Sequence, residues 1–99
     1  MLYVITCTDK ANSVDLRMSV RPDHLAYLET AGDRLKVAGP LLSVGEDPKP
    51  IGSVIIIDAA SDAAVQLFAD NDPYATAGLF EKVEIKPWKA AVGVWAQSE

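Results

Sequence analysis

The pattern of hydrophobic and polar positions predicts a strand near each end of the chain, from a largely apolar stretch at the start and from a strict alternation over residues 82–86. Residues 2–8 combine β-branched with aromatic side chains, and residues 82–86 set Val83 and Ile85 between Lys and Glu neighbours. A period of two is typical of a strand that buries one face. We therefore expect a first strand over 2–8 and a late strand over 82–86. Residues 91–96 are expected to add a short final strand.

Two further apolar stretches predict strands in the middle of the chain. Residues 35–42 carry Gly39 and Pro40 near their end, and a polar loop over 43–50 follows. Residues 52–59 contain an uninterrupted run of Val and Ile. Such a run is typical of a strand that is buried on both faces. We therefore expect cover on both sides of this third strand.

Helical periodicity extends from Ser13 to about Leu35, but Pro22 stands in the middle of it. Proline is tolerated in the first turn of a helix and disrupts a helix interior. The pattern therefore predicts a short helical piece over 14–18 and a main helix that starts at about Pro22. This break would put His24 in the first turn of the main helix.

A second helix is predicted from the residues at its ends. Ser61 is a preferred N-cap residue, and Asp62 suits the positive end of the helix that follows. The helix is expected to run to about Asp70 and to stop near Asp72, because Pro73 disfavours helical geometry in the residue before it.

The predicted order is strand, helix, strand, strand, helix, strand, which is the split β-α-β arrangement of ferredoxin-like folds. We expect one α+β domain over residues 1–99 with an antiparallel sheet. Both helices would lie on one face of that sheet and leave the other face uncovered. A second copy of the chain is the simplest cover, so a homodimer is expected. Trp88 and Trp95 are expected to be core or dimer contacts.

The charge balance excludes some classes of partner. The formal net charge is -5, and no run of Lys or Arg forms a local exception. Because nucleic-acid affinity rests on cationic neutralisation of phosphates, neither nucleic acid nor an anionic membrane is expected as a partner. No apolar stretch approaches the roughly 20 residues that cross a bilayer, and the start resembles no signal peptide. A soluble, cytoplasmic protein is expected.

His24 is the only histidine, and it falls on the inward-facing stripe of its helix together with Leu28 and Ala31. An inward imidazole needs a hydrogen-bond partner. The periodicity of the second helix also puts Asp72 on an apolar face, at the negative end of that helix, where a carboxylate needs compensation. Because the two helices of a ferredoxin-like fold lie side by side, His24 and Asp72 could meet.

A pair of His24 and Asp72 has two interpretations, and residue spacing alone does not choose between them. In the first, Asp72 fixes the tautomer and orientation of a neutral imidazole, which then acts as a general base. In the second, the pair is structural and ties two helices together. No Ser or Cys is presented as a nucleophile, and no second histidine is present for a metal site. Neither a metal nor a cofactor is therefore expected.

Four residues are expected to line a cleft beside this pair, and each has a plainer alternative. Arg21 could meet an anionic substrate or stay solvated at the surface. Gly39 and Pro40 could let a ligand approach the backbone or could simply end a strand. Tyr74 could line the cleft or only pack against it. Cys7, the only cysteine, is expected to be a small buried side chain rather than a reactive thiol.

Five short segments resemble, in order, those of YCII-related proteins. They are residues 2–5, 21–25, 38–40, 71–74 and 83–88. Each segment alone is unspecific, but the ordered set extends over nearly the whole chain. The sequence therefore resembles the YCII-related family, which belongs to the dimeric α+β barrel superfamily.

The resemblance implies a ferredoxin-like chain whose sheet packs face to face on the sheet of a second copy. It also implies an enzyme with a His–Asp pair in a cleft, and those roles fall on His24 and Asp72. We expect a cofactor-independent isomerisation or elimination on a small organic molecule. The alternative is a non-catalytic small-molecule-binding or accessory dimer. Haem or metal binding, which some superfamily relatives show, finds little support in one histidine and one cysteine.

Overall fold

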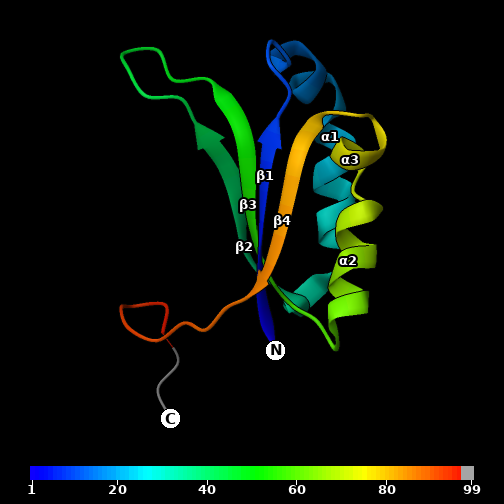
Figure 1. Ribbon diagram of the computed structural model, residues 1–99, viewed down its shortest axis with the longest axis vertical. Coiled ribbons are helices and arrows are strands. Elements are labelled where there is room, and N and C mark those ends of the chain that lie inside the picture. The colour runs from blue at the N-terminus through cyan, green and yellow to red at the C-terminus, as the bar shows by residue number, and fades with distance from the viewer. Residues whose placement is uncertain (97–99) are drawn as a thin grey trace.

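The structure, a computed structural model, describes residues 1–96 and contains a four-stranded antiparallel sheet (Figure 1). Its strands are β1 (Leu2–Asp9), β2 (Leu35–Leu42), β3 (Pro50–Asp58) and β4 (Phe80–Pro87). They lie in the order β2-β3-β1-β4. This is a ferredoxin-like order, and the α+β fold class expected from the sequence is confirmed. Residues 97–99 of the expected domain lie outside the described residues.

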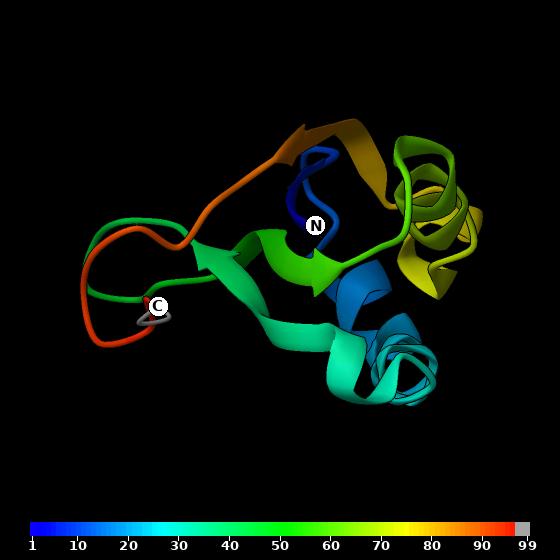
Figure 2. The same cartoon turned by 90° about the horizontal axis from the view of Figure 1, so that it is seen from below.

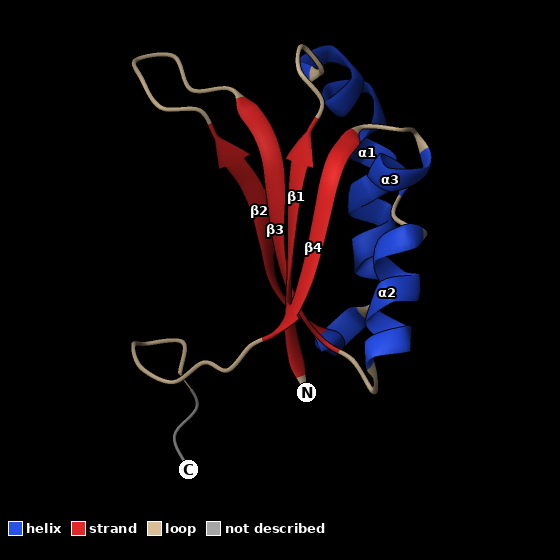
Figure 3. Cartoon of the chain, viewed as in Figure 1, coloured by secondary structure: helices blue, strands red, loops and turns tan. Residues whose placement is uncertain are grey.

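The helices lie on one side of the sheet. They are α1 (Val14–Glu29), α2 (Asp62–Asp70) and the short α3 (Pro73–Thr76), and a 3-10 turn at Gly32–Arg34 precedes β2. Figure 2, which views the molecule from below, and Figure 3, which separates helices from strands by colour, show this arrangement. Ser61 caps α2 as predicted, because its hydroxyl accepts the N–H of Ala64. None of the helices in residues 1–96 is long and apolar enough to cross a membrane.

Ile5 lies at the centre of the core, on the sheet face that the helices cover. It pairs with Ile55 on β3 and with Ile85 on β4, and directly opposite residues of antiparallel strands point to the same face. Leu28 of α1 and Val65 of α2 belong to the same hydrophobic cluster. Each fully buried side chain of this size contributes about 1.5–3 kcal/mol relative to its exposed state. This apolar layer fixes the helices on the sheet.

Within residues 1–96 no helix covers the face of β3 that points away from α1 and α2, and Trp88, Ala90 and Trp95 line a pocket there together with Ile56. Val54 and Ile56 on that face are half-buried, whereas Ile55 and Ile57 on the helix side are buried. The prediction of a strand buried on both faces is therefore not met within one chain. The physical reason is that both helical connections cross on the same side of the sheet, as Figure 2 shows.

The predicted break at Pro22 is wrong, because α1 is one helix with Pro22 inside it. Proline removes the backbone hydrogen bond to the carbonyl of Met18, but both residues are exposed, so water can solvate that oxygen. Arg17 before the proline and His24 after it are both buried and hold the helix against the rest of the chain. Packing thus outweighs the local cost, and His24 lies in the helix interior rather than in a first turn.

The predicted final strand over 91–96 is also wrong. Residues 88–96 carry no strand and form bends and a turn that lead away from the sheet (Figure 1). Gly93 has a φ of 100°, which an extended strand does not adopt. Trp88 and Trp95 are 39% and 72% exposed, so neither belongs to the core of this chain.

The close pairing of β3 with β1 at Gly52 leads to a prediction about stability. A Cβ at Gly52 would collide with the backbone carbonyl oxygen of Cys7, whereas a Cβ at Gly39 on the neighbouring strand would meet no atom within 4 Å. We expect Gly52→Ala to lower the free energy of unfolding by about 1–3 kcal/mol, because backbone must move to relieve the clash. Gly39→Ala is the matched control and should change it by less than about 0.5 kcal/mol. Urea denaturation followed by circular dichroism measures both, and equal stability of the two variants would contradict the register.

Candidate active site

Asp72 lies between α2 and α3 and is the N-cap of α3. Its backbone is extended, and its carboxylate Oδ1 accepts the N–H of Tyr74 at 2.9 Å. Pro73 occupies the first helical position, where proline is favoured because its missing N–H would have no partner there. The helix α3 was not anticipated from the sequence. It compensates the carboxylate of Asp72, which follows the negative end of α2 but accepts the N–H of Tyr74 at the positive end of the next helix.

His24 of α1 contacts the same carboxylate oxygen. The distance from His24 Nδ1 to Asp72 Oδ1 is 2.8 Å, and both side chains are buried. An ionised carboxylate only accepts hydrogen bonds, so this contact requires the proton to be on Nδ1. In the neutral ring, the lone pair is then on Nε2. The structure thus brings the two predicted partners together, and their role in catalysis stays a prediction.

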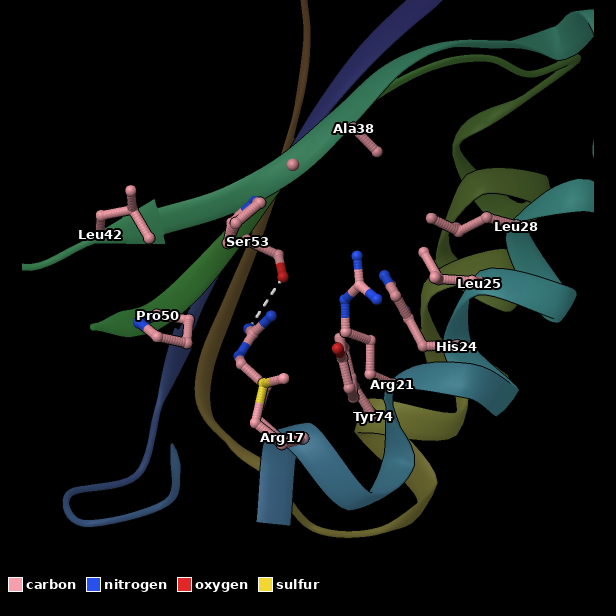
Figure 4. A pocket seen from close by; sticks show the side chains of 13 residues that line it. Arg17, Arg21, His24, Leu25, Leu28, Ala38, Leu42, Pro50, Ser53 and Tyr74 are labelled. Carbon is pink, nitrogen blue, oxygen red and sulfur yellow. Dashed lines mark hydrogen bonds between the residues drawn. The ribbon is translucent and has the colours of Figure 1, made fainter. Parts of the chain in front are cut away.

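The rings of His24 and Tyr74 stack with their centroids 3.9 Å apart and their planes at 17°. Asp72 Oδ1 holds both Nδ1 of His24 and the backbone N–H of Tyr74. The Nδ1 edge of the imidazole and the backbone end of the tyrosine therefore lie beside Asp72. Both residues line the cavity, and Figure 4 shows the His24 ring and the Tyr74 hydroxyl directed toward it.

Arg17 of α1 is a buried cation held by two strands. Its Nε and Nη2 donate to the two carboxylate oxygens of Asp9 at 2.7 and 2.9 Å, and Nη2 also donates to Ser53 Oγ at 2.9 Å. Asp9 ends β1 and Ser53 lies on β3. Burial alone would lower the pKa of Arg17, but the hydrogen bonds and charge of Asp9 outweigh it, so the pKa is raised. The guanidinium therefore stays charged in the protein interior.

Tyr74 fills the space between Arg17 and His24. These two residues are seven positions apart on α1, which is about two helical turns or about 10 Å along the axis. The Arg17 guanidinium carbon lies 4.5 Å from the centroid of the Tyr74 ring, and His24 stacks on that ring as well. Figure 4 shows the tyrosine between the two side chains. One aromatic ring thus packs between a guanidinium and an imidazole from the same helix.

A cavity of about 430 Å³ opens between α1 and the ends of β2 and β3 (Figure 4). Its lining comprises Arg17, Met18, Arg21, His24, Leu25, Leu28, Ala38, Gly39, Pro40, Leu42, Pro50, Ser53 and Tyr74. Five of the six predicted site residues are thus in the lining. The sixth, Asp72, lies behind His24. Whether these residues act on a substrate stays a prediction.

The sequence reading missed Arg17 and Ser53. Arg17 precedes His24 by seven residues, and a helix brings positions seven apart to nearly the same face. That signal was hidden by the expected break at Pro22, which separates the two residues into different helices. Ser53 pairs with Cys7 on β1 and faces the helices, so its position follows only from the strand register.

Cys7 is not a candidate nucleophile. Its side chain is buried, and burial, assisted by the negative charge of Asp72, raises the pKa of the thiol to about 12. A neutral thiol is a weak nucleophile. Among residues 1–96, no group of three or more His, Cys, Asp or Glu side chains lies together in a way that could hold a metal ion.

Comparisons with known proteins identify relatives along most of the chain. The sequence model of the YCII-related domain matches residues 1–89. Protein YciI of Escherichia coli is 47% identical over 95 residues, which are 90% of this chain and 97% of that protein. The derivative of benzaldehyde biosynthesis cluster protein C of Emericella nidulans is 41% identical over 87 residues, which are 78% of this chain and 88% of that protein.

A solved structure adds a comparison at the level of the fold. It is 5-chloro-2-hydroxyhydroquinone dehydrochlorinase from Burkholderia phenoliruptrix in complex with 2,5-dihydroxybenzoquinone. The match has a TM-score of 0.87 and 35% sequence identity, and it covers 92% of this chain and 96% of that one. The fold described above is therefore shared with a dehydrochlorinase that binds a small quinone.

The burial and raised pKa of the Cys7 thiol lead to a prediction about its reactivity. With a pKa of about 12 the thiol is protonated at about pH 8, so a thiol reagent should modify the native protein about 10³-fold or more slowly than the unfolded chain. The release of thionitrobenzoate from Ellman's reagent, with and without guanidinium chloride, measures both rates. Because Cys7 is the only cysteine, the signal has one source, and Cys7→Ser gives the blank. Comparable native and unfolded rates would contradict the burial of this thiol.

Proposed function

The chain belongs to the YCII-related family, and we propose that it is an enzyme in which His24 and Asp72 carry out acid–base chemistry on a small, oxygen-rich organic molecule. The observation that carries this proposal is the orientation of His24. Its Nδ1 is anchored on a buried carboxylate 2.8 Å away, and the ring lines the cavity. An imidazole held in this way presents Nε2 as a base to whatever occupies that space.

The proposed step is a proton transfer. Nε2 of His24 removes a proton from a carbon next to a substrate carbonyl group, and the imidazolium that forms is paired with the Asp72 carboxylate. Asp72 remains ionised and holds the ring in one orientation, as the carboxylate of a catalytic triad does. Such a step moves no electrons to or from an outside carrier, so we propose that it needs no cofactor.

The volume and the lining of the cavity favour a small anionic substrate that contains a ring with apolar faces. Its volume of about 430 Å³ is in the ordinary range for small-molecule sites, about 300–1,000 Å³. Met18, Leu25 and Leu28 supply apolar wall, and Arg21 supplies a positive charge that has no ion-pair partner among residues 1–96. The dehydrochlorinase relative binds 2,5-dihydroxybenzoquinone, a planar molecule with acidic hydroxyl groups. A hydroxyquinone-like or enolisable ring is therefore the substrate class we propose.

We also propose that the chain is a homodimer, with the uncovered sheet face as its interface. Val37, Ile56 and Val4 are aligned across β2, β3 and β1 on that face, because Ile56 pairs with each of the other two. All three retain exposure in the single chain. A row of aliphatic side chains is a natural contact between two copies, since its burial removes apolar surface from water. A cytoplasmic location likewise remains a prediction.

The catalytic proposal is tested with 5-chloro-2-hydroxyhydroquinone as substrate, by following chloride release by ion chromatography. The reacting form is the diketo tautomer of this ring, in which a CH2 group lies between a carbonyl group and the chlorinated carbon, so that removal of one of its protons and loss of chloride leave a hydroxyquinone. We expect His24→Gln to lower the enzymatic rate by about 10²–10⁴-fold because the general base is lost. Asp72→Asn should also lower it severely, because an amide favours the wrong tautomer of His24. Asp70→Asn, a change of the same chemistry at an exposed position two residues away, should leave the rate unchanged.

The non-catalytic alternative makes the opposite prediction for the same proteins. It expects the wild type to bind 2,5-dihydroxybenzoquinone but to release no chloride above the uncatalysed background. In that case His24→Gln would only weaken binding or lower the melting temperature. This combination of results would refute the enzyme proposal, provided that circular dichroism shows the wild type to be folded.

The proposed dimer is tested by sedimentation velocity. The wild type should sediment with about twice the chain mass of 10.6 kDa. Ile56→Lys should shift the equilibrium strongly toward monomer, because it would bury an unpaired charge at the interface. Leu67→Lys changes an aliphatic residue on the exposed side of α2 and should remain dimeric. A wild type that sediments as a single chain at every concentration tested would exclude the dimer.

A further inference from the structure

We propose that the hydroxyl of Tyr74 donates a hydrogen bond to the negatively charged oxygen that forms on the substrate, and that Arg17 is the positioning residue that holds Tyr74 for this task. The inference rests on the proposed function, because it names the group that receives the charge created when His24 removes a proton. It deepens that function by requiring a carbonyl oxygen on the substrate beside the acidic carbon.

The direction of the two rings supports this role. Asp72 anchors His24 and the backbone of Tyr74 through one oxygen, and the rings of both residues line the cavity, where Figure 4 shows the His24 ring and the Tyr74 hydroxyl directed toward the same space. The phenol hydroxyl and Nε2 belong to two stacked rings whose centroids are 3.9 Å apart. A single small molecule in this space can present a C–H bond to Nε2 and an adjacent carbonyl oxygen to the hydroxyl. The geometry thus separates the base from the hydrogen-bond donor within one ligand's reach.

The hydroxyl is available to a ligand. Within residues 1–96 it has no protein acceptor for its proton, and no fully buried polar side-chain atom in that part lacks a partner. Tyr74 lines the cavity although the residue as a whole is only 2% exposed, and Figure 4 shows its hydroxyl directed toward that space. Burial raises the pKa of Tyr74, and the nearby charges of Arg17 and Arg21, together with hydrogen bonding from the Arg17 guanidinium to the phenol oxygen, offset this only in part. The phenol accordingly keeps its proton at neutral pH and can act as a donor.

Arg17 is built to position rather than to bind by itself. Its Nε and Nη2 donors are already engaged by Asp9 and Ser53, so three of its five N–H bonds are used inside the protein. The planar guanidinium then covers one face of Tyr74 while His24 covers the other. A ring packed on both faces loses its freedom to swing away. A preorganised donor of this kind needs no reorientation when charge develops on the substrate.

The proposed reaction passes through an enolate. Nε2 of His24 takes a proton from the acidic carbon, and the C–H electron pair forms a carbon–carbon double bond while the carbonyl π pair moves to oxygen. The resulting enolate oxygen accepts the hydrogen bond from Tyr74, whose proton is not transferred. When the carbonyl re-forms, the carbon–carbon π pair has two possible fates. It shifts toward the carbon next to the acidic one and expels an anionic leaving group from it, or, in an enolate conjugated to a further double bond, the pair at the far end of the conjugated system takes the proton back from the imidazolium. The first outcome is an elimination, after which the imidazolium gives its proton to water, and the second is an isomerisation.

Tyr74→Phe is the central test, because it removes the hydroxyl and keeps the ring between Arg17 and His24. We expect kcat for chloride release to fall by about 10²–10³-fold, the usual loss for one oxyanion donor, while KM changes little. Binding of 2,5-dihydroxybenzoquinone, which is ionised at neutral pH and visible by its absorbance, should weaken by about 10- to 100-fold. The matched control is Tyr27→Phe on α1, which removes a hydroxyl that donates to the Phe68 carbonyl of α2 and lies outside the cavity lining. It should alter stability alone.

Arg17→Lys tests the positioning role, since it keeps the charge but loses the planar fork that binds Asp9 and covers Tyr74. We expect kcat to fall, and we expect the double variant with Tyr74→Phe to be no slower than Tyr74→Phe alone. A residue that only stabilises the fold would give multiplicative losses in kcat instead. If Arg17→Lys fails to fold, Ser53→Ala removes one of its three hydrogen bonds and serves the same comparison.

The outcomes separate this inference from the proposed function. If His24→Gln is inactive while Tyr74→Phe keeps full kcat, the enzyme proposal stands and the inference is overturned. If no protein releases chloride, the quinone-binding measurement decides: weaker binding by Tyr74→Phe than by wild type and Tyr27→Phe supports an anion-binding hydroxyl. Equal binding by all three, or no binding by the wild type, refutes it.

Discussion

The geometry of the site depends on one carboxylate oxygen. Oδ1 of Asp72 accepts hydrogen bonds from the imidazole of His24 on α1 and from the backbone of Tyr74 at the start of α3. Removing either partner would leave a buried charge short of hydrogen bonds, which is costly in a protein interior. The oxygen therefore fixes two rings from separate elements against each other. Without this contact, neither the tautomer of His24 nor the direction of the Tyr74 hydroxyl would be defined.

The second constraint is the continuity of α1. Arg17 and His24 can hold Tyr74 between them only if two full helical turns separate them, and Pro22 lies within those turns. The exposed position of Pro22 confines the missing hydrogen bond to the solvent side of the helix. On the opposite side, Asp9 and Ser53 fasten the first half of the helix to β1 and β3. The buried ion pair is thus part of what keeps the helix unbroken at the site.

Local patterns predicted the parts of the structure that depend on local forces. The alternation around Val83, the apolar run around Ile55 and the cap at Ser61 each correspond to an observed element. The wrong predictions concern places where contacts between distant parts of the chain determine the structure. The helix continues through Pro22 because its buried side chains hold it, and Arg17 was missed because its partners come from two strands. Residues 91–96 have strand-forming composition, yet Gly93 turns the chain away from the sheet. The pairing of His24 with Asp72 was within reach of sequence reasoning, because periodicity put both side chains on inward faces.

Local charge rather than net charge decides which ligands the cavity admits. The chain carries a formal charge of -5, yet no acidic side chain in the described part lines the cavity. Asp9 and Asp72 lie behind Arg17 and His24 and are already matched with them. Charges at the surface act through a screening length of about 8 Å at physiological ionic strength, so distant carboxylates have little effect inside the cavity. Arg21 in the wall then sets the sign of the potential that a ligand meets. An anionic ring is therefore attracted to the cavity, although the rest of the protein surface would repel it. The same positive potential stabilises the negative charge that forms on the substrate when its proton is removed.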